Sequence, residues 1–302
     1  MNNQKVIKNI EKLSLIGKGG FAEIYLIREK NTQEKFAMKV IDESKLNEKE
    51  ASLMENEIKI LSNANHPNII KLYQIINDAQ NKNYKYLILE YCNGGSLQNN
   101  LYQYMSMYTK PFPEKLVQKI MKNILSAVKY LHDKGIIHRD LKLDNILVKY
   151  QNEYDLQTLN IYNAEIKVID FNNSYLPNLN GPMTFVGTVP NMAPTIVENL
   201  MLPGKKYDEK VDIWSLGVVC YEMLFGMPLF PSMNDDKVFA DILAGNFSIP
   251  KTISIQARTF LYCMLRKQGI NRLTATELLN HEFIVGDYHK FKHYDINKKK
   301  TI

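Results

Sequence analysis

The stretch that most constrains this chain is residues 136–148, I-I-H-R-D-L-K-L-D-N-I-L-V. Both of its ends are short apolar runs, which predicts a polar loop held between two buried strands. The loop carries many charged or amide side chains, among them His138, Arg139, Asp140, Lys142 and Asn145. Burying so many polar groups at the edge of a core costs free energy unless they are paired or functional. We therefore predict that this segment is a catalytic loop.

The composition places this loop in an ordinary globular protein. The chain has 302 residues, 45% hydrophobic and 23% charged, enough for one large domain or two joined lobes. No run approaches the roughly 18 apolar residues of a membrane span, and the first residues lack the apolar segment of a signal peptide. We expect no membrane span and an intracellular location, cytoplasmic or nuclear.

Cysteine and charge patterns add two further expectations. Cys92, Cys220 and Cys263 are widely separated in apolar surroundings, so we expect buried free thiols with no metal-ligand spacing. The formal charge is +6, but Lys and Arg are spread along the chain, and the one local basic run, residues 298–300, is short. We therefore expect no nucleic-acid partner.

Near the N-terminus, residues 13–27 form two apolar runs joined by a glycine-rich turn, which predicts a strand, a loop and a second strand. Gly17 and Gly19 let the backbone approach a ligand closely, which suits a phosphate chain. The pattern alone is weak, because a plain hairpin turn has the same composition. Its third glycine position is Ala22.

Lys39 lies in the apolar run 36–41, where a buried lysine needs a negative partner. The alternative is a lysine at a sheet edge that reaches solvent. Residues 48–63 predict a helix, and Glu57 lies on its apolar stripe beside Met54, Ile58 and Leu61. Glu57 is therefore the expected partner of Lys39.

The rest of the chain predicts two more strands and then a mainly helical part. Apolar runs at 69–76 and 86–91 indicate strands, and the turn cluster at 93–96 indicates a lobe boundary. An amphipathic helix over 116–131, ended by Gly135, precedes the catalytic loop. The polar interval 150–164 is expected to be an exposed hairpin extension.

In the second half of the chain, two acidic residues lie at the ends of predicted elements. Asp170 follows an apolar strand directly, where a strand end can present a carboxylate to a cleft. Residues 212–226 are apolar nearly all round, which predicts a central buried helix with Asp212 at its N-terminus.

Taken in order, these motifs resemble a eukaryotic protein kinase catalytic domain of the serine/threonine type. The set is G-K-G-G-F-A-E-I, F-A-M-K, Glu57, H-R-D-L-K-L-D-N, D-F-N, G-T-V-P-N-M-A-P-T, D-I-W-S-L-G and Arg272. The resemblance covers about residues 13–283. It implies an α+β bilobal fold, with a small β-rich N-lobe with one main helix, a larger α-helical C-lobe, and ATP in the cleft between them. We place the kinase domain at 10–285, its lobes at 10–92 and 93–285, and a basic polar tail at 286–302.

The resemblance also implies roles for the charged residues. Lys39 would hold the α- and β-phosphates of ATP and be oriented by Glu57. Asn145 and Asp170 would bind Mg²⁺ through oxygen atoms. Asp140 would accept or orient the proton of the substrate hydroxyl, and Lys142 would neutralise charge beside it. His138 would pack beneath Phe171, and so would not be a catalytic base.

By the same resemblance, the nucleotide would contact mostly apolar and glycine positions, for which simple core packing is an equally compatible explanation. These positions, with Lys39, are Ile16, Gly17, Gly19, Ile24, Ala37, Leu89, Glu90, Cys92 and Leu147.

Regulation and substrate choice are also implied. Lys142 together with Thr188 resembles the serine/threonine branch, and Arg139 matches an arginine that pairs with an activation-loop phosphate, for which Thr184 is the candidate phosphosite. A plain exposed threonine is the alternative for Thr184. Asp144 and Glu222 match acidic positions that receive a basic residue of the protein substrate. The oligomeric state stays open.

Three departures from the family pattern keep a second hypothesis open. Asn172 replaces a glycine in the metal-binding motif, Thr195 replaces the glutamate that pairs with Arg272, and Asn191 replaces an aromatic residue. Asn tolerates unusual backbone angles, whereas losing one partner of a buried ion pair costs about 3 kcal/mol or more. The alternative is a pseudokinase that acts as a nucleotide-binding scaffold or interaction module. A metabolic small-molecule kinase is disfavoured, because a peptide-docking segment ending near 193–194 is present.

Overall fold

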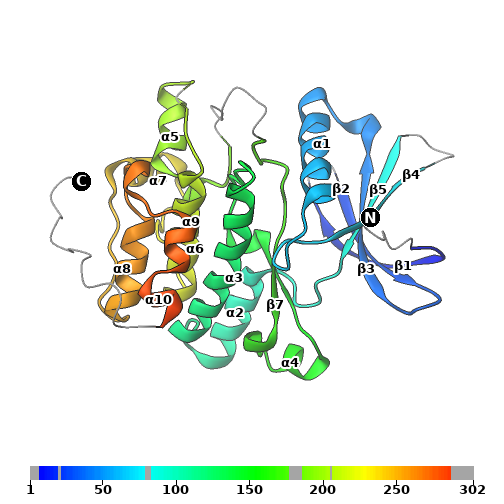
Figure 1. The fold of residues 1–302 in the computed structure, drawn as a ribbon, viewed down its shortest axis with the longest axis horizontal. Coiled ribbons are helices and arrows are strands. Elements are labelled where there is room, and N and C mark those ends of the chain that lie inside the picture. Colours follow the sequence, from blue (N-terminus) through cyan, green and yellow to red (C-terminus); the bar gives the residue numbers. More distant parts are fainter. Residues whose placement is uncertain (1–6, 20–21, 79–82, 177–185, 205, 287–302) are drawn as a thin grey trace. The chain divides into compact units, whose positions relative to one another are not determined.

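The computed structural model describes residues 7–19, 22–78, 83–176, 186–204 and 206–286. The chain divides into two compact units, Met1–Asn93 and Gly94–Ile302, each described here by itself (Figure 1). The candidate phosphosite Thr184 and nearly all of the basic tail lie outside the described residues.

The first unit is a five-stranded antiparallel sheet with one long helix. The strands run in the order β1-β2-β3-β5-β4. Their bounds are β1 (Ile10–Lys18), β2 (Ala22–Glu29), β3 (Lys35–Asp42), β4 (Leu72–Asn77) and β5 (Tyr84–Glu90). A short 3-10 turn, η1 (Glu43–Lys45), precedes helix α1 (Glu48–Asn63). Helix α1 starts where predicted because Asn47 and Glu50 form a reciprocal capping box at its first turn.

The sheet has two chemically different faces, since successive side chains of a strand point to opposite sides. One face is an apolar core of Ile27, Phe36 and Ile88, to which Ile7 adds its side chain from before β1. Ile7 is anchored there by its main-chain N–H, which donates to Oε1 of Gln74 at 2.8 Å. The other face therefore remains for the residues that alternate with this core set.

The second unit is mainly helical. Its longer helices are α2 (Leu97–Tyr108), α3 (Glu114–His132), α5 (Pro194–Met201), α6 (Lys210–Phe225), α7 (Asp235–Ala244) and α8 (Ile255–Met264). Its shorter helices are α4 (Glu153–Gln157), α9 (Ala275–Leu279) and α10 (Glu282–Val285). Helix α6 is buried along nearly its whole length, as its uniformly apolar sequence predicts. It runs through this unit with α3 and α8 packed against it (Figure 1).

The second unit also contains a small sheet that frames the catalytic loop. Strands β6 (Ile146–Lys149) and β7 (Glu165–Val168) are antiparallel, and Ile146 lies opposite Val168. The prediction of a second strand, just before the loop, is wrong, because Ile137 forms only an isolated bridge with Tyr175. The loop is therefore flanked by one strand, and its remaining support must come from elsewhere in the unit.

The interval between β6 and β7 is more ordered than the exposed extension that its polar sequence predicts. It contains α4 and a 3-10 turn, η3 (Ile161–Asn163). Asp155 is 4% exposed, and its carboxylate accepts hydrogen bonds from the side-chain amides of Asn152, Asn160 and Asn163. The prediction was therefore wrong for the inner residues of this interval, because a buried carboxylate with several donors organises it.

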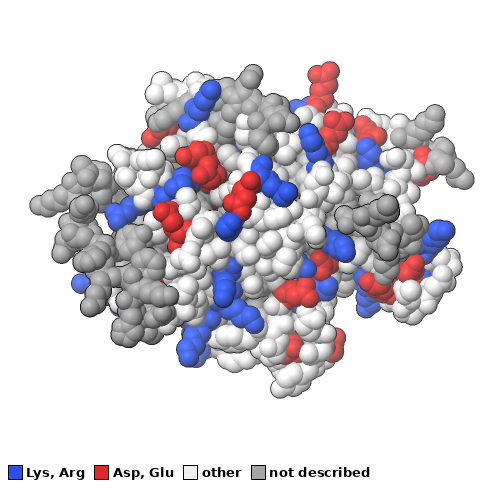
Figure 2. Space-filling model, in the orientation of Figure 1, with Lys and Arg blue, Asp and Glu red and all other residues white. Residues whose placement is uncertain are grey.

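The described surface carries both signs of charge. Figure 2 shows Lys and Arg side chains interspersed with Asp and Glu on the face in view. No described helix has the length and apolar character needed to cross a membrane. All three cysteines are buried and free, as expected.

Candidate active site

Lys39 and Glu57 form a buried ion pair in the first unit. Nζ of Lys39 on β3 contacts Oε2 of Glu57 on α1, and the two side chains are only 11% and 5% exposed. The prediction that Glu57 partners Lys39 is confirmed, and the solvent-reaching alternative is wrong. An ion pair with so little water around it survives because each charge compensates the other.

The candidate nucleotide residues of the first unit fall largely on one face of its sheet. Ala37 and Lys39 are two residues apart on β3, and their cross-strand partners include Ile24 opposite Lys39 and Leu89 opposite Ala37. Antiparallel partners point to the same side. This face is opposite to the core of Ile27, Phe36 and Ile88, so the sheet separates its packing side from its candidate ligand side.

The remaining nucleotide candidates are placed as follows. Gly17 lies opposite Ile24 across the β1–β2 turn, and the main-chain N–H of Gly19 donates to the carbonyl of Ala22 at 2.9 Å. Ile16 is 44% exposed, whereas Glu90, the last residue of β5, and Cys92, just after it, are buried. Leu147 belongs to the second unit, on β6.

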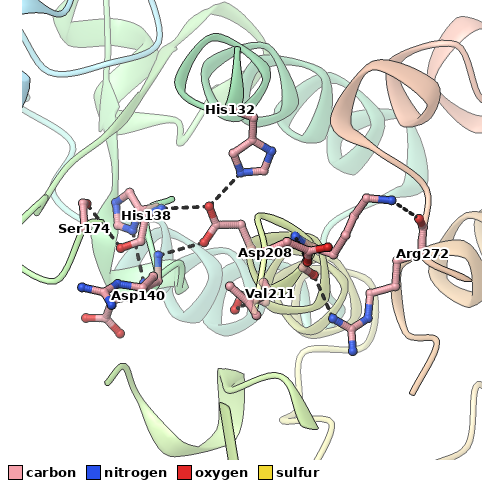
Figure 3. A network of polar contacts seen from close by, with 11 residues as sticks. His132, His138, Asp140, Ser174, Asp208, Val211 and Arg272 are labelled. Atoms are coloured by element: carbon pink, nitrogen blue, oxygen red, sulfur yellow. Dashed lines mark hydrogen bonds and ion pairs between the residues drawn. The ribbon is translucent and has the colours of Figure 1, made fainter. Parts of the chain in front are cut away.

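The catalytic loop is held in place by Asp212 of α6. Its carboxylate accepts the main-chain N–H groups of His138 and Arg139, each at 2.8 Å, and lies 2.8 Å from Nε2 of His132 on α3 (Figure 3). Burial alone would raise the pKa of Asp212, but the hydrogen bond and charge of His132 and the loop amides hold it below its usual range. Asp212 lies in the first turn of α6, near the helix N-terminus as predicted. Its carboxylate also fixes the loop, a contact between distant residues that the sequence pattern does not encode.

Within the loop, the carboxylate of Asp140 lies close to Thr188 and Lys142. Thr188 donates its hydroxyl to Oδ1 of Asp140 at 2.7 Å, and Lys142 donates to the same hydroxyl oxygen at 2.7 Å. Nζ of Lys142 lies 3.4 Å from Oδ2 of Asp140. Gly187 lets this segment approach the loop, because a Cβ there would lie 2.6 Å from the carbonyl oxygen of Arg139. A substrate hydroxyl placed at Asp140 would therefore meet a carboxylate and an ammonium together.

Asn145 and Asp170 supply the candidate metal ligands. Nδ2 of Asn145 donates to the carbonyl and to Oδ2 of Asp140, at 2.8 and 3.2 Å, which leaves its amide oxygen for a cation. The N–H of Ile169 donates to the carbonyl of Asn145 at 3.0 Å and brings Asp170 beside it. One carboxylate and one amide oxygen suit Mg²⁺, which keeps several waters and takes further ligands from phosphates. Accordingly, no described group of three or more His, Cys, Asp or Glu side chains could hold a metal by itself.

His138 has a structural role, as predicted. Its ring lies 5.1 Å from that of Phe171, and Nδ1 accepts the N–H of Asp140 at 3.3 Å. Nε2 lies 2.9 Å from the carbonyl of Ile169, which requires the hydrogen on Nε2. Both ring nitrogens are therefore engaged, and neither is left for proton transfer with a substrate.

Arg139 reaches away from the catalytic group. Nε donates to the carbonyl of Asn173 at 2.5 Å and one terminal nitrogen donates to the hydroxyl of Tyr207 at 3.2 Å. The pairing of Arg139 with a phosphate on Thr184 remains a prediction, since Thr184 lies outside the described residues.

Arg272 has other partners in place of the glutamate that Thr195 replaces. Its guanidinium donates to three main-chain carbonyls, those of Lys210, Arg266 and Lys267, at 2.7 to 2.9 Å. It also lies 5.1 Å from the ring centroid of Trp214, and its place beside α6 can be followed in Figure 3. Burial lowers the pKa of Arg272 to about 10. Carbonyl dipoles and an indole face therefore surround this charge where the family pattern has a glutamate.

The comparisons with known proteins agree with this geometry. The family described as the protein kinase domain matches residues 10–284. Calcium-dependent protein kinase 5 of Plasmodium berghei (strain Anka) is 34% identical over 99% of this chain and 50% of its own length. Serine/threonine-protein kinase Aurora-1 of Arabidopsis thaliana is 33% identical over 89% of this chain and 84% of its length. Myosin light chain kinase A of Dictyostelium discoideum is 32% identical over 95% and 94%.

The five-stranded sheet with its helix, the helical second unit and the family match together define the class. The chain belongs to the protein kinase family, and the predicted α+β bilobal fold is confirmed. It spans half the length of the Plasmodium relative and most of the other two. Members of this family are transferases that use ATP and a divalent metal, usually Mg²⁺, and act on protein substrates.

Proposed function

We propose that this chain is an ATP-dependent serine/threonine protein kinase, which transfers the γ-phosphate of Mg-ATP to Ser and Thr hydroxyls of proteins. The observation that carries the proposal is the contact set of Asp140, Lys142 and Thr188. The buried Lys39–Glu57 pair supports it, since a pseudokinase commonly lacks one or more of these charged groups, and this chain retains all of them.

In the proposed reaction, Asp140 accepts a hydrogen bond from the substrate hydroxyl and takes its proton as the oxygen bonds to the γ-phosphorus. The bond from that phosphorus to the bridging oxygen breaks, and ADP leaves. Lys142 stabilises the negative charge on the transferred group. Asn145 and Asp170 would hold Mg²⁺, which supplies neutralisation of phosphate charge when bound.

For the nucleotide, we propose that Lys39, oriented by Glu57, binds the α- and β-phosphates. Gly17 and Gly19 would let the main chain of the loop approach the phosphates closely. The adenine ring would pack against the apolar candidates and bond to the main chain of the segment 90–92. The shared sheet face of Ile24, Ala37, Lys39 and Leu89 supports this assignment.

For the protein substrate, we propose a preference for a basic residue near the phosphoacceptor. Burial, and after it the nearby charge of Asp144, raises the pKa of Glu222 to about 7. A carboxyl held in such a place regains its charge readily when a cation approaches. A peptide library that reveals no preference for Arg or Lys would remove this part of the proposal.

The direct test is turnover of Mg-ATP on a generic basic protein, with Asp170→Ala as the inactive control. We expect phosphate transfer by the wild type to Ser and Thr and almost none by the variant. Equal rates for the two proteins would contradict the enzyme assignment and favour the pseudokinase. Mass spectrometry of the chain after incubation with ATP would report autophosphorylation and test Thr184 in the same sample.

A further inference from the structure

Asn172 makes a side-chain contact that its place in the metal-binding motif does not require. Its Nδ2 donates to Oδ1 of Asp170 at 2.8 Å. Its own oxygen, Oδ1, is buried and accepts no hydrogen bond within the described residues. One half of this amide therefore holds a candidate metal ligand, and the other half has no donor.

The backbone does not explain why an asparagine occupies position 172. The residue in the left-handed region is Asp170, with φ 64°, whereas Asn172 is absent from the described non-glycine residues with positive φ. The tolerance of Asn for unusual backbone angles is therefore not used in this conformation. What distinguishes Asn172 from a glycine here is the contact of its side chain.

The contact restricts the carboxylate of Asp170. Among the described residues, Asp170 accepts no other side-chain hydrogen bond, so Oδ2 remains for a cation. A buried acceptor without a donor costs about 1–3 kcal/mol.

We propose that Asn172 is a positioning residue for the metal. Its Nδ2 fixes Oδ1 of Asp170, so that Oδ2 of Asp170 is presented to the cation. The inference rests on the proposed role of Asp170 as a metal ligand. It assigns to the side chain of Asn172 a part that a glycine at this position cannot take.

The test measures metal binding without turnover. The full chain would be titrated with Mn²⁺ in the presence of adenylyl imidodiphosphate, a nucleotide that does not transfer its phosphate, and free Mn²⁺ followed by electron paramagnetic resonance. Asn172→Leu keeps the approximate shape of the side chain and removes both polar atoms, and Asn172→Gly removes the side chain. Asn173→Ala is the matched control, because Asn173 contacts Arg139 through its main-chain carbonyl, which the substitution keeps.

We expect both Asn172 variants to bind Mn²⁺ about ten-fold more weakly, the usual effect of removing a group that orients a metal ligand. Asn173→Ala should bind Mn²⁺ as the wild type does. Nucleotide affinity in EDTA should be the same for all four proteins. Without metal, Asn172→Leu should unfold at the same temperature as the wild type or higher, because it loses a buried unsatisfied oxygen.

Three results would overturn the proposal. One is Mn²⁺ affinity in Asn172→Leu equal to that of the wild type. Another is a loss of metal affinity that accompanies an equal loss of metal-free nucleotide affinity and of thermal stability, which would indicate a structural role. The third is an absence of Mn²⁺ binding by the wild type. Because the assay needs no turnover, an inactive chain that shows the expected Mn²⁺ pattern would contradict the proposed function and leave this inference intact.

Discussion

The hydroxyl of Thr188 donates a hydrogen bond to Oδ1 of Asp140 at 2.7 Å and accepts one from Lys142. It therefore ties the segment after Gly187 to the proposed catalytic carboxylate. Thr188→Val keeps the shape of this side chain and removes both bonds. We expect kcat to fall about ten- to a hundred-fold, the equivalent of one or two hydrogen bonds to charged groups. Steady-state kinetics on a basic peptide would measure it.

The control for this variant is Thr188→Ser, which retains the hydroxyl and should restore most of the rate. A valine variant with wild-type kcat would mean that the contact does not contribute to the chemical step.

The Lys39–Glu57 pair predicts a stability pattern distinct from its effect on activity. Lys39→Met or Glu57→Leu alone leaves one buried charge without a partner and should lower the free energy of unfolding by about 3–5 kcal/mol. The double variant removes both charges and should recover most of that loss. It should remain inactive, because it lacks Lys39, the proposed ligand of the ATP phosphates. Urea unfolding of the four proteins would measure the pattern.

A partly exposed pair in the same unit provides the comparison. Lys85 and Glu43 are 2.5 Å apart but 23% and 33% exposed. Glu43→Gln should therefore cost only about 0–1 kcal/mol. If the double variant of the buried pair were no more stable than the singles, the two charges would not be compensating each other.

Glu222 predicts a pH-dependent substrate preference. With a pKa of about 7, about a tenth of the carboxyl is ionised at pH 6 and about nine tenths at pH 8. If Glu222 receives a basic residue, the ratio of kcat/KM for an Arg-containing peptide to that for its Ala counterpart should rise across this range. Glu222→Gln should make the ratio low and flat. A wild-type ratio that does not change with pH would exclude this role.

The same group predicts the pH dependence of stability. The pKa of Glu222 is raised in the folded protein, so its stabilising contribution is complete below the unfolded value of 4.5 and is lost as pH rises through about 7. Glu222→Gln, which cannot ionise, should therefore gain stability relative to the wild type between pH 5 and pH 8, as compared by thermal unfolding.

Replacing Arg272 should lower the free energy of unfolding strongly, although the chain lacks the glutamate that pairs with this arginine in the family pattern. Arg272→Leu would leave three carbonyls without their donor, and we expect a loss of about 3–5 kcal/mol. Lys267→Ala is the control, because Lys267 is exposed and contributes only its carbonyl. Its effect should stay within about 0.5 kcal/mol. Equal urea midpoints for Arg272→Leu and wild type would contradict the assignment.

The parts of the site that the sequence predicted are those whose chemistry is local. A lysine inside an apolar strand and a glutamate on an apolar helix stripe each require an opposite charge, so Lys39 and Glu57 could be paired before their contact was known. Periodicity likewise predicted α1 and α3, and a uniformly apolar run predicted α6.

What the sequence could not reveal depends on partners that leave no side-chain pattern. Main-chain carbonyls surround Arg272, and Asp212 reaches loop amides more than 70 positions away. The short run Ile136–Ile137 was assigned a strand because a run of two residues cannot distinguish a strand from extended loop. Asn172 is visible in the sequence as a departure from the family pattern, but the pattern does not reveal what its side-chain amide contacts.

Because Ile7 is buried, a fragment of this domain should begin before residue 7. The family match begins at residue 10, yet Ile7 is 2% exposed and completes the core on one side of the first sheet. A protein shortened to residue 10 would carry a hole beneath Phe36 and Ile88, and filling or emptying such a hole is worth about 2–5 kcal/mol. The side chain of Ile7 thus fills a space in the core of the first unit, and any recombinant fragment should retain this residue.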